Sequence, residues 1–328
     1  MDPFERVPLG GTGVTVTRLG MGLAPIGGLF EPVGDAAATA TIDTAWDLGV
    51  RFFDTAPLYG AGLSERRAGA ALRRRDRSAF TLATKVGRRL VPEQSGKDHA
   101  AGMWAEPSGA SAVWDFSFSG VRLSYRESLA RLGLDRADVL HLHDPDVHFG
   151  PAVAEALPAL VELRKAGEIG AVSAGMNQSA MLTEFARTGA FDCFLLAGRY
   201  TLLDQSGLAD LLPECARRGL SVIVGGVYNS GVLADPDRRA VYDYHPATAR
   251  VINRTRALAK ICGRHGVPLR AAALQFPLAH PAVASVLVGM RSAREAADAA
   301  AMARWEIPGR LWRDLIREGL LDPEVPHP

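Results

Sequence analysis

The chain has 328 residues, of which 48% are hydrophobic and 22% are charged, and its formal net charge at pH 7 is +1. These values are typical of a globular protein with enough apolar residues for a large core. The near-neutral balance gives no charged footprint of the kind that binds nucleic acid or an anionic membrane, so we expect neither as a partner.

Short apolar runs alternate with helical patterns along almost the whole chain. The opening segment VPLGGTGVTVTR predicts a β-hairpin with its turn at Gly10–Gly13. In chain order the spacing then predicts a strand at 19–23, a helix from Asp35, a strand at 50–53, a helix at 64–72, a strand at 80–84, a helix at 119–132, a strand at 138–142, a helix at 151–166, a strand at 169–174, a helix at 178–187, a strand at 191–196, a helix at 206–218, a strand at 220–224, helices near 247–263 and 268–279, a strand at 284–288 and a helix at 292–304.

These strands are short and apolar, and each is followed by a helix, which indicates a parallel sheet covered by helices. Eight such units in about 290 residues favour a (β/α)8 TIM barrel over an open doubly wound sheet. No G-x-G-x-x-G motif lies between a strand and a helix, which also disfavours a Rossmann fold. Because no linker divides the chain, we expect residues 1–328 to form one α/β domain. The N-terminal hairpin is part of it, and long βα loops, above all 86–117, cover the C-terminal mouth.

The ends of the chain and its cysteines carry no export or metal signal. The N-terminal MDPFERVPLGG has charged residues and no apolar core, so no signal peptide is expected. No run approaches the roughly eighteen apolar residues of a membrane span. Cys193, Cys215 and Cys262 are widely spaced, which favours reduced thiols in a cytoplasmic protein and predicts no metal site. We expect a monomer or a homodimer.

Four ionisable residues stand where predicted strands end. Asp54 and Lys85 follow the second and third barrel strands, and His143 follows the fourth, while Tyr59 lies in the loop after Asp54. Active sites of such barrels are built at these carboxyl ends, so we expect the four side chains to meet at one mouth. His141 shares a face with His143 but lies one layer deeper, where a hydrogen-bonded core histidine is expected.

Together these side chains are suited to proton transfer. A free tyrosine has a pKa of about 10, which a nearby ammonium group lowers by favouring the phenolate. A carboxylate can keep that lysine charged, and an imidazole can orient a substrate oxygen. Singly, each residue has an ordinary explanation, as a helix cap, a loop lysine or an apolar plug. The combination at successive strand ends favours catalysis.

The segments FFDTAPLYG, TKVG and VLHLHD, in this order, resemble the aldo-keto reductase superfamily over essentially the whole chain. Within it, GVRLSYRESLARLGLDRADVLHLHDPD and GGVYNSGVL resemble the group that contains aldose 1-dehydrogenases of the L-fucose or D-threo-aldose type and pyridoxal 4-dehydrogenase. The resemblance implies NAD(P) bound across the barrel mouth. It also implies Tyr59 as the proton-transfer residue, Lys85 and Asp54 as its tuning pair, and His143 as the substrate-orienting residue.

The activity implied by this resemblance is oxidation of the anomeric hydroxyl of an aldose to a lactone, with hydride transfer to nicotinamide. Two alternatives in the same class remain open, a pyridoxal 4-dehydrogenase and a general aldehyde or ketone reductase. An alternative of a different class is a non-catalytic barrel that senses nicotinamide redox state. The intact set of four residues disfavours the sensor, because a sensor needs no proton-transfer chemistry.

The resemblance also assigns residues to the cofactor. The usual contacts to the nicotinamide ring are replaced at Gly175-Met176, Ala197 and Gly225, so Asn177 is expected to hold the carboxamide. The loop GGVYNSGVL is expected to approach the pyrophosphate. The full set of expected cofactor residues is Asn177, Gly226, Tyr228, Ser230, Gly231, Gly289, Arg291 and Glu295.

The region after the last strand bears on the choice between NAD and NADP. Gly289 and Glu295 occupy positions where basic residues often clamp the 2′-phosphate of NADP, and Arg291 is the nearby cation. A carboxylate accepts a ribose hydroxyl and repels a phosphate, which favours NAD, with NADP possible. A second interpretation is local: Ser292 and Glu295 have the spacing of a capping box.

The loop 86–117 is expected to form the substrate wall. Trp114 is the main candidate for stacking on a sugar or pyridine ring, with Trp104 and Phe116 beside it, and the same aromatics could instead anchor the loop. His143 is expected to orient the reacting oxygen. Asp144 and Arg199 are possible partners for sugar hydroxyls.

Overall fold

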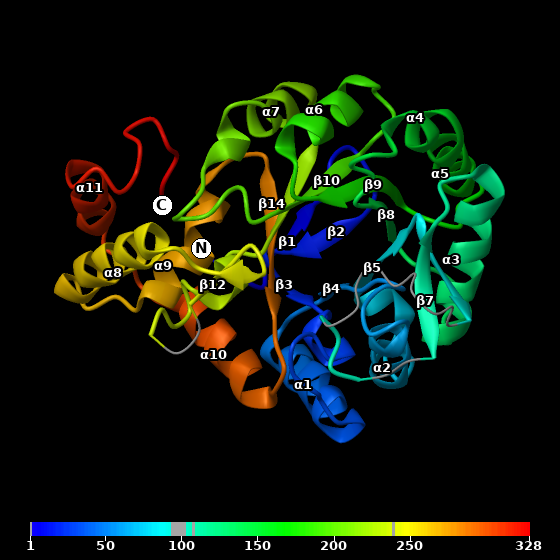
Figure 1. Ribbon diagram of the computed structural model, residues 1–328, viewed down its shortest axis with the longest axis horizontal. Coiled ribbons are helices and arrows are strands. Elements are labelled where there is room, and N and C mark those ends of the chain that lie inside the picture. Colours follow the sequence, from blue (N-terminus) through cyan, green and yellow to red (C-terminus); the bar gives the residue numbers. More distant parts are fainter. Residues whose placement is uncertain (1, 93–102, 107–108, 238–239) are drawn as a thin grey trace.

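A computed structural model describes residues 2–92, 103–106, 109–237 and 240–328. Its centre is a closed barrel in which each parallel strand pairs with the next along the chain and the last pairs with the first (Figure 1). The barrel strands in the described part of the chain are β3 (Leu19–Gly22), β4 (Phe52–Asp54), β5 (Thr81–Val86), β8 (Val139–His143), β9 (Ala171–Met176), β10 (Cys193–Ala197), β11 (Ser221–Gly225) and β14 (Val283–Gly289). The predicted (β/α)8 barrel is confirmed.

Helices surround the barrel and alternate with its strands (Figure 1). Two of them, α8 and α9, lie between β11 and β14, and the last helix, α11, packs against α8. The main helices of the described residues are α1 (Asp35–Leu48), α2 (Leu63–Leu72), α3 (Phe118–Leu132), α5 (Leu157–Lys165), α6 (Ser179–Arg187), α7 (Leu211–Arg218), α8 (Ala249–Arg264), α9 (Leu269–Gln275), α10 (Ala293–Arg304) and α11 (Gly309–Arg317).

Some predicted helices are interrupted where a side chain or a proline changes the backbone pattern. The helix expected at 151–166 consists of α4 (Phe149–Pro151), a π-helical segment at Ala152–Ala156 and α5, in which Pro158 cannot donate a backbone hydrogen bond. The helix expected at 206–218 begins as a 3-10 turn and restarts as α7, whose N-cap is Asp210. The helix near 268–279 continues beyond α9 as a 3-10 turn that contains Pro277.

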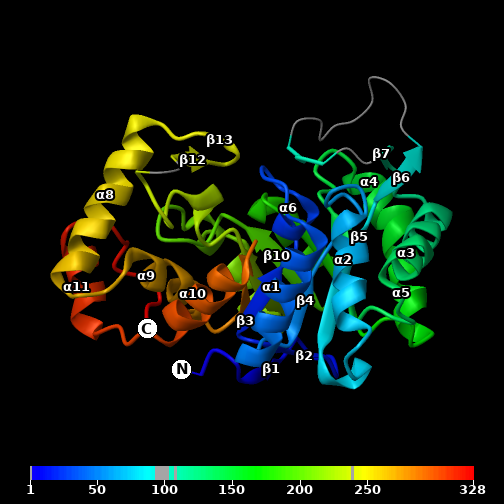
Figure 2. The same ribbon diagram turned by 90° about the horizontal axis from the view of Figure 1, so that it is seen from below.

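In the described part of the chain, three antiparallel strand pairs lie at the two ends of the barrel. The predicted N-terminal hairpin is confirmed as β1 (Arg6–Pro8) paired with β2 (Thr15–Thr17), and it lies at the N-terminal end (Figure 2). At the opposite end lie β6 (Arg88–Pro92) with β7 (Ala110–Trp114), and β12 (Val241–Tyr242) with β13 (His245–Pro246) (Figure 2). The segment 86–117 was expected to be irregular, and β6 and β7 correct that expectation; residues 93–102 and 107–108 lie outside the described residues.

The core has two shells because strand side chains alternate between the two faces of a barrel wall. The outer shell packs strands against helices. The inner shell fills the lower barrel and is closed by Leu9 and Val16 near the hairpin β1–β2. Its strand members are Phe52, Ala83, Val139, Ala171, Cys193, Leu195, Ile223, Ala284 and Leu287. This apolar floor leaves only the upper barrel for polar side chains.

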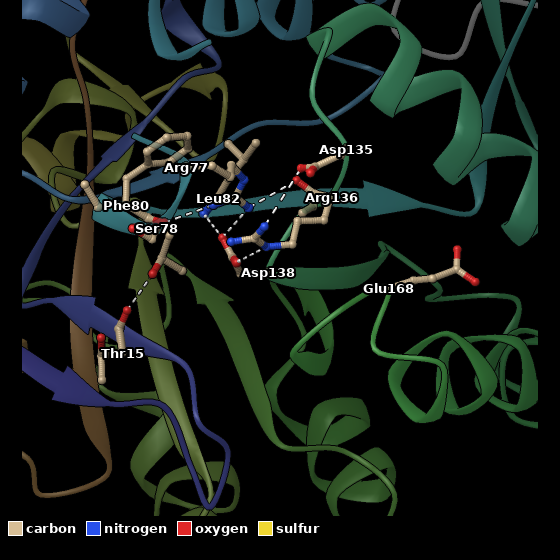
Figure 3. Close-up of polar contacts among 12 residues, drawn as sticks. Thr15, Arg77, Ser78, Phe80, Leu82, Asp135, Arg136, Asp138 and Glu168 are labelled. Atoms are coloured by element: carbon tan, nitrogen blue, oxygen red, sulfur yellow. Dashed lines mark hydrogen bonds and ion pairs between the residues drawn. The ribbon is translucent and has the colours of Figure 1, made fainter. Parts of the chain in front are cut away.

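A polar cluster below β5 and β8 fixes the register of these two strands (Figure 3). Asp138, just before β8, donates its backbone N–H to the carbonyl of Leu82, and its carboxylate accepts the N–H of Leu82 at 2.8 Å. Arg77 donates to the same carboxylate at 2.6 Å, and Arg136 lies 3.7 Å from it. In the resulting register Lys85 is the strand partner of His141.

The three cysteines all lie in described parts of the chain, where they are buried and free, as the sequence predicts. Within those same parts, the helices are all too short or too polar to cross a lipid bilayer.

Candidate active site

The four residues expected at the strand ends meet at the C-terminal mouth of the barrel. Lys85 Nζ lies 2.5 Å from Asp54 Oδ1 and also donates to the carbonyl of Thr55 at 2.9 Å. The same ammonium group lies 4.9 Å from the centre of the Tyr59 ring. The ring of His143 meets that of Tyr59 edge-on, with 5.8 Å between ring centres. Asp54, Lys85 and His143 are each at least 95% buried.

The turn that presents Tyr59 depends on two glycines. Gly60 has φ +61°, and a Cβ there would lie 2.2 Å from the carbonyl oxygen of Gly27. A Cβ on Gly27 would in turn lie 2.9 Å from the carbonyl of Tyr59. No larger residue fits either position, so the Pro25–Gly27 turn packs directly on the backbone of Tyr59 and fixes its height above Lys85.

The surroundings set the charge of each group. Although burial pushes it upward, Lys85 and then His141 hold the pKa of Asp54 below its usual value, so the carboxylate is charged. Burial, followed by the charge of Asp54, raises the pKa of Tyr59 well above 10 even though one side of Tyr59 faces the cleft. Burial also lowers the pKa of His143 well below its usual value. The direction of this shift is opposite to the lowered pKa expected from the sequence, because loss of hydration is its largest cause.

His141 and Ser173 continue the polar layer that Asp54 and Lys85 begin. His141 is fully buried, as expected, and its Nδ1 lies 2.7 Å from Ser173 Oγ on the next strand. Its Nε2 lies 3.3 Å from Asp54 Oδ2, on the side of the carboxylate away from Lys85. His141 is thus more than a core histidine, since it contacts the proposed tuning pair.

Next to Tyr59 opens a long cleft of about 1160 Å³. It extends from Asp54 and Tyr59 past the end of β11 to the start of α10. All eight residues expected to contact the cofactor line it: Asn177, Gly226, Tyr228, Ser230, Gly231, Gly289, Arg291 and Glu295. Its volume and lining fit a dinucleotide.

The backbone after β11 has a conformation that allows a ligand to approach it closely. Asn229 and Ser230 have φ values of +45° and +59°, which residues other than glycine rarely adopt. Asn229 is held there by donation from its Nδ2 to the carbonyl of Gly198 at 3.2 Å. Such strain is typical of ligand-binding loops, and it fits backbone contact with a phosphate group.

At the far end of the cleft Arg291 is clamped between two carboxylates. Its Nη1 lies 2.7 Å from Glu31 Oε2, and its Nη2 lies 2.7 Å from Glu295 Oε1. Ser292 caps the N–H of Glu295 as the capping-box interpretation predicts, while the Glu295 carboxylate accepts from the N–H of Arg291 instead of that of Ser292. The cation is therefore neutralised within the protein.

Elsewhere at the mouth, a chain of contacts runs from Trp114 to His143 through two charged residues. Arg88 stacks on Trp114 at 4.1 Å and pairs with Asp144 at 2.7 Å. Asp144 Oδ2 lies 3.7 Å from His143 Nε2, and its backbone has φ +44°. Trp114 also stacks on the buried Phe116, so it has an anchoring contact as well as a place in this wall.

Two further residues considered for the substrate, Trp104 and Arg199, have partners within the protein. Trp104 packs on Tyr59 at 5.7 Å between ring centres, held by a β-bridge to Leu29. Arg199 is not at the substrate wall. It pairs in bidentate fashion with Asp243, at 3.0 and 2.9 Å, and thereby supports the β12–β13 turn.

Sequence reasoning missed several residues that line the cleft, among them Phe30, Glu31 and Tyr244. Phe30 and Tyr244 come from loops more than 200 positions apart, yet their rings lie 6.2 Å from each other. Both have positive φ values, a signal that the sequence of an irregular loop does not carry. The aromatic residues Tyr228 and Tyr244 give the cleft ring surfaces that Gly225 lacks.

The model of the Aldo/keto reductase family matches residues 18–310. The chain belongs to this family. The reductase is accordingly an NAD(P)-dependent oxidoreductase, and the family resemblance of the sequence is confirmed.

Relatives of known activity resemble the reductase over most of their length. It is 41% identical to D-threo-aldose 1-dehydrogenase from Pseudomonas sp, over 94% of this chain and 96% of the relative. It is 39% identical to pyridoxal 4-dehydrogenase from Microbacterium luteolum, over 97% and 98%. It is 34% identical to L-galactose dehydrogenase from Arabidopsis thaliana, over 89% and 86%.

Solved structures share the fold of the reductase. An aldo-keto reductase from Bacillus halodurans in its holo form is 25% identical with a TM-score of 0.75, over 96% of this chain and 95% of that one. A glycerol dehydrogenase from Gluconobacter oxydans is 20% identical with a TM-score of 0.76, over 99% and 97%, which supports the fold alone.

Proposed function

We propose that the reductase oxidises the anomeric hydroxyl of an aldose to a lactone, with NAD as the hydride acceptor. The observation that carries this proposal is the gathering of Asp54, Tyr59, Lys85 and His143 at one end of a dinucleotide-sized cleft. Two relatives are named for dehydrogenation of sugars, and they support an aldose substrate.

NAD, when bound, supplies the two-electron acceptor that takes the hydride from the carbinol carbon. The protein handles the proton. Tyr59 takes the hydroxyl proton in oxidation and returns it in reduction. His143 is neutral because burial lowers its pKa, so its imidazole can donate a hydrogen bond to the reacting oxygen without adding a charge.

The raised pKa of Tyr59 affects substrate oxidation and the reverse reduction differently. In the resting protein Tyr59 is a phenol, which is ready to donate a proton in reduction. Oxidation needs the phenolate, which a cationic group entering the cleft and a rising pH both favour. Lys85, paired with Asp54 beneath the ring, stabilises that phenolate once it forms.

The wall formed by Arg88, Asp144 and Trp114 supports a polyol substrate. An aromatic face beside an Arg–Asp pair offers one apolar surface together with hydrogen-bond donors and acceptors. Asp144 Oδ2 lies 3.7 Å from His143 Nε2, which makes Asp144 a candidate acceptor for a second substrate hydroxyl near the reacting oxygen. A simple alkyl aldehyde offers no hydroxyl to hydrogen-bond with this pair.

The preference for NAD rests on the clamp around Arg291. A 2′-phosphate would have to displace Glu31 or Glu295 from Arg291 and would lie beside both carboxylates. A ribose 2′-hydroxyl can instead donate to Glu295.

The test is a substrate panel with NAD and with NADP, in which lactone formation is followed by NMR. L-fucose, D-arabinose and L-galactose are compared with pyridoxal and with a simple alkyl aldehyde. We expect sustained turnover of at least one aldose with NAD. Turnover of the alkyl aldehyde alone would contradict the proposal.

Pyridoxal is the second candidate substrate, because a relative named for it is 39% identical. Its hemiacetal also carries an oxidisable carbinol within a ring, so oxidation again gives a lactone. A preference for pyridoxal over every sugar would favour this activity. A single turnover without a sustained rate on any substrate would favour a nicotinamide redox sensor.

A further inference from the structure

The strands β4, β5, β8 and β9 are consecutive in the barrel, and each sends a polar side chain inward two residues above an apolar one. Asp54 follows Phe52, Lys85 follows Ala83, His141 follows Val139 and Ser173 follows Ala171. The register pairs Lys85 with His141, and His141 with Ser173. Four consecutive strands therefore build one continuous polar layer between the apolar floor and the mouth.

We propose that His141 is a positioning residue, which donates a hydrogen bond from Nε2 to Asp54 Oδ2 and is itself aligned by Ser173. The contact is 3.3 Å long. Among the described residues neither atom meets hydrogen-bond geometry with any partner, the other atom included, although both are fully buried. A buried carboxylate oxygen without a donor is costly, so the nitrogen 3.3 Å away is the donor that we assign to it.

The proposal requires one tautomer of His141. In that tautomer Ser173 donates its hydroxyl to Nδ1, 2.7 Å away, and the proton of the neutral imidazole is on Nε2, where it faces Asp54. Burial lowers the pKa of His141, so the ring adds no charge beside Lys85. The opposite tautomer would place a bare nitrogen lone pair against a carboxylate oxygen.

As a consequence, the two carboxylate oxygens of Asp54 have different partners. Oδ2 is held by His141, and this leaves Oδ1 directed at Lys85 at 2.5 Å. Without His141 the carboxylate can rotate about χ2, and Lys85 then loses its fixed counter-ion beneath Tyr59. The effect passes through Asp54 and Lys85 and does not involve contact with the substrate.

The kinetic test compares His141→Leu with His141→Gln, and it rests on the proposed function. The amide nitrogen of glutamine can replace Nε2 as a donor, whereas leucine fills the space without a donor. We expect His141→Leu to lower kcat by about tenfold to a hundredfold with little change in KM. His141→Gln should recover most of that loss. Wild-type kcat in a folded His141→Leu variant, or equal loss in the two variants, would overturn the proposal.

Ser173→Ala has a matched control in Ser285→Ala. Ser285 is an equally buried strand serine, but its hydroxyl donates to the carbonyl of Thr17 near the other end of the barrel. We expect a several-fold loss of kcat for Ser173→Ala and an unchanged kcat for Ser285→Ala. Equal effects of the two substitutions would count against alignment by Ser173.

A second measurement needs no turnover and therefore separates this inference from the proposed function. Nitrogen NMR of the full-length protein labelled in histidine reports the tautomer of His141, assigned by its absence in His141→Gln. We expect a neutral ring with its proton on Nε2. A proton on Nδ1 with a bare Nε2 would overturn the inference even if the enzyme oxidises aldoses. If the wild type turns over nothing, the proposed function fails and this spectrum still decides the role of His141.

Discussion

Tyr59 shows how two opposing influences act on one side chain. A lysine ammonium 4.9 Å from the ring centre favours the phenolate, whereas burial and the charge of Asp54 favour the phenol. The second influence is larger, so the pKa is raised. The protein alone therefore presents a proton donor, and oxidation depends on conditions that remove the proton.

This balance predicts the pH dependence of each direction. Because the pKa of Tyr59 lies above 10, the phenolate fraction grows about tenfold per pH unit below it. We expect kcat for aldose oxidation to rise between pH 6 and pH 9, and kcat for the reverse reduction to stay nearly level. Steady-state rates at saturating cofactor measure both. An oxidation rate that peaks below pH 7 would contradict the raised pKa.

Arg291 illustrates how neighbouring carboxylates can cancel the attraction of a cation for a phosphate group. Alone it would attract a phosphate, but Glu31 and Glu295 bind it first. We expect kcat/KM to be higher with NAD than with NADP, and the double change Glu31→Gln with Glu295→Gln to reduce that ratio by about tenfold.

A matched control for this pair is Glu5→Gln, which removes a carboxylate from Arg18 at the other end of the barrel. Glu5→Gln should leave the ratio of kcat/KM with NAD to kcat/KM with NADP unchanged. A preference for NADP in the wild type would show that Arg291 is released from its carboxylates when the cofactor binds.

At the scale of elements, strand pairing at the N-terminal end sets the geometry at the mouth. Asp138 binds the N–H of Leu82 and the side chain of Arg77, and this fixes β5 against β8. A slip of one residue would turn Lys85 or His141 out of the barrel, because side chains alternate along a strand.

Asp138→Ala is therefore expected to destabilise the fold by about 2 kcal/mol, since it leaves the buried N–H of Leu82 without an acceptor and removes the carboxylate that pairs with Arg77. The midpoint of urea unfolding measures this loss. Asp138→Asn keeps an acceptor oxygen and should lose less. An unchanged midpoint in Asp138→Ala would show that the backbone pairing alone holds the two strands in register.

The sequence predicts the barrel strands better than the loops, for a physical reason. An apolar strand that ends on Asp54 or His143 is recognisable because the core imposes its pattern on consecutive residues. The hairpin β6–β7 and the turn at Tyr244 are stabilised by contacts with distant segments, such as the pair of Arg88 with Asp144. Their own residues carry no comparable pattern.

The same distinction applies within the site. The meeting of the four strand-end residues could be predicted because every parallel strand of a barrel ends at the same mouth. The contact of His141 with Asp54 could not, since it depends on the stagger between strands that are not adjacent. The raised pKa of Tyr59 depends on how much protein surrounds the ring, which no local pattern specifies.

At the scale of the whole molecule, the two ends of the barrel have separate tasks. The N-terminal end is closed by β1–β2 and by ion pairs such as Arg77 with Asp138, whereas the C-terminal end carries the cleft and the polar residues. Stability and chemistry are thus provided by different residues. Substitutions at one end are expected to change unfolding midpoints, and substitutions at the other to change rates.

The most direct test of the central claim is the steady-state rate of NADH formation, followed by near-ultraviolet absorbance, for the wild type and Tyr59→Phe. Tyr125→Phe is the control, because that buried hydroxyl donates to the carbonyl of Glu168 and is remote from the mouth. We predict sustained NADH formation from an aldose by the wild type and by Tyr125→Phe, and a loss of about 10³-fold in Tyr59→Phe with NADH binding retained. A near-normal rate in Tyr59→Phe would contradict the assignment of proton transfer to this residue.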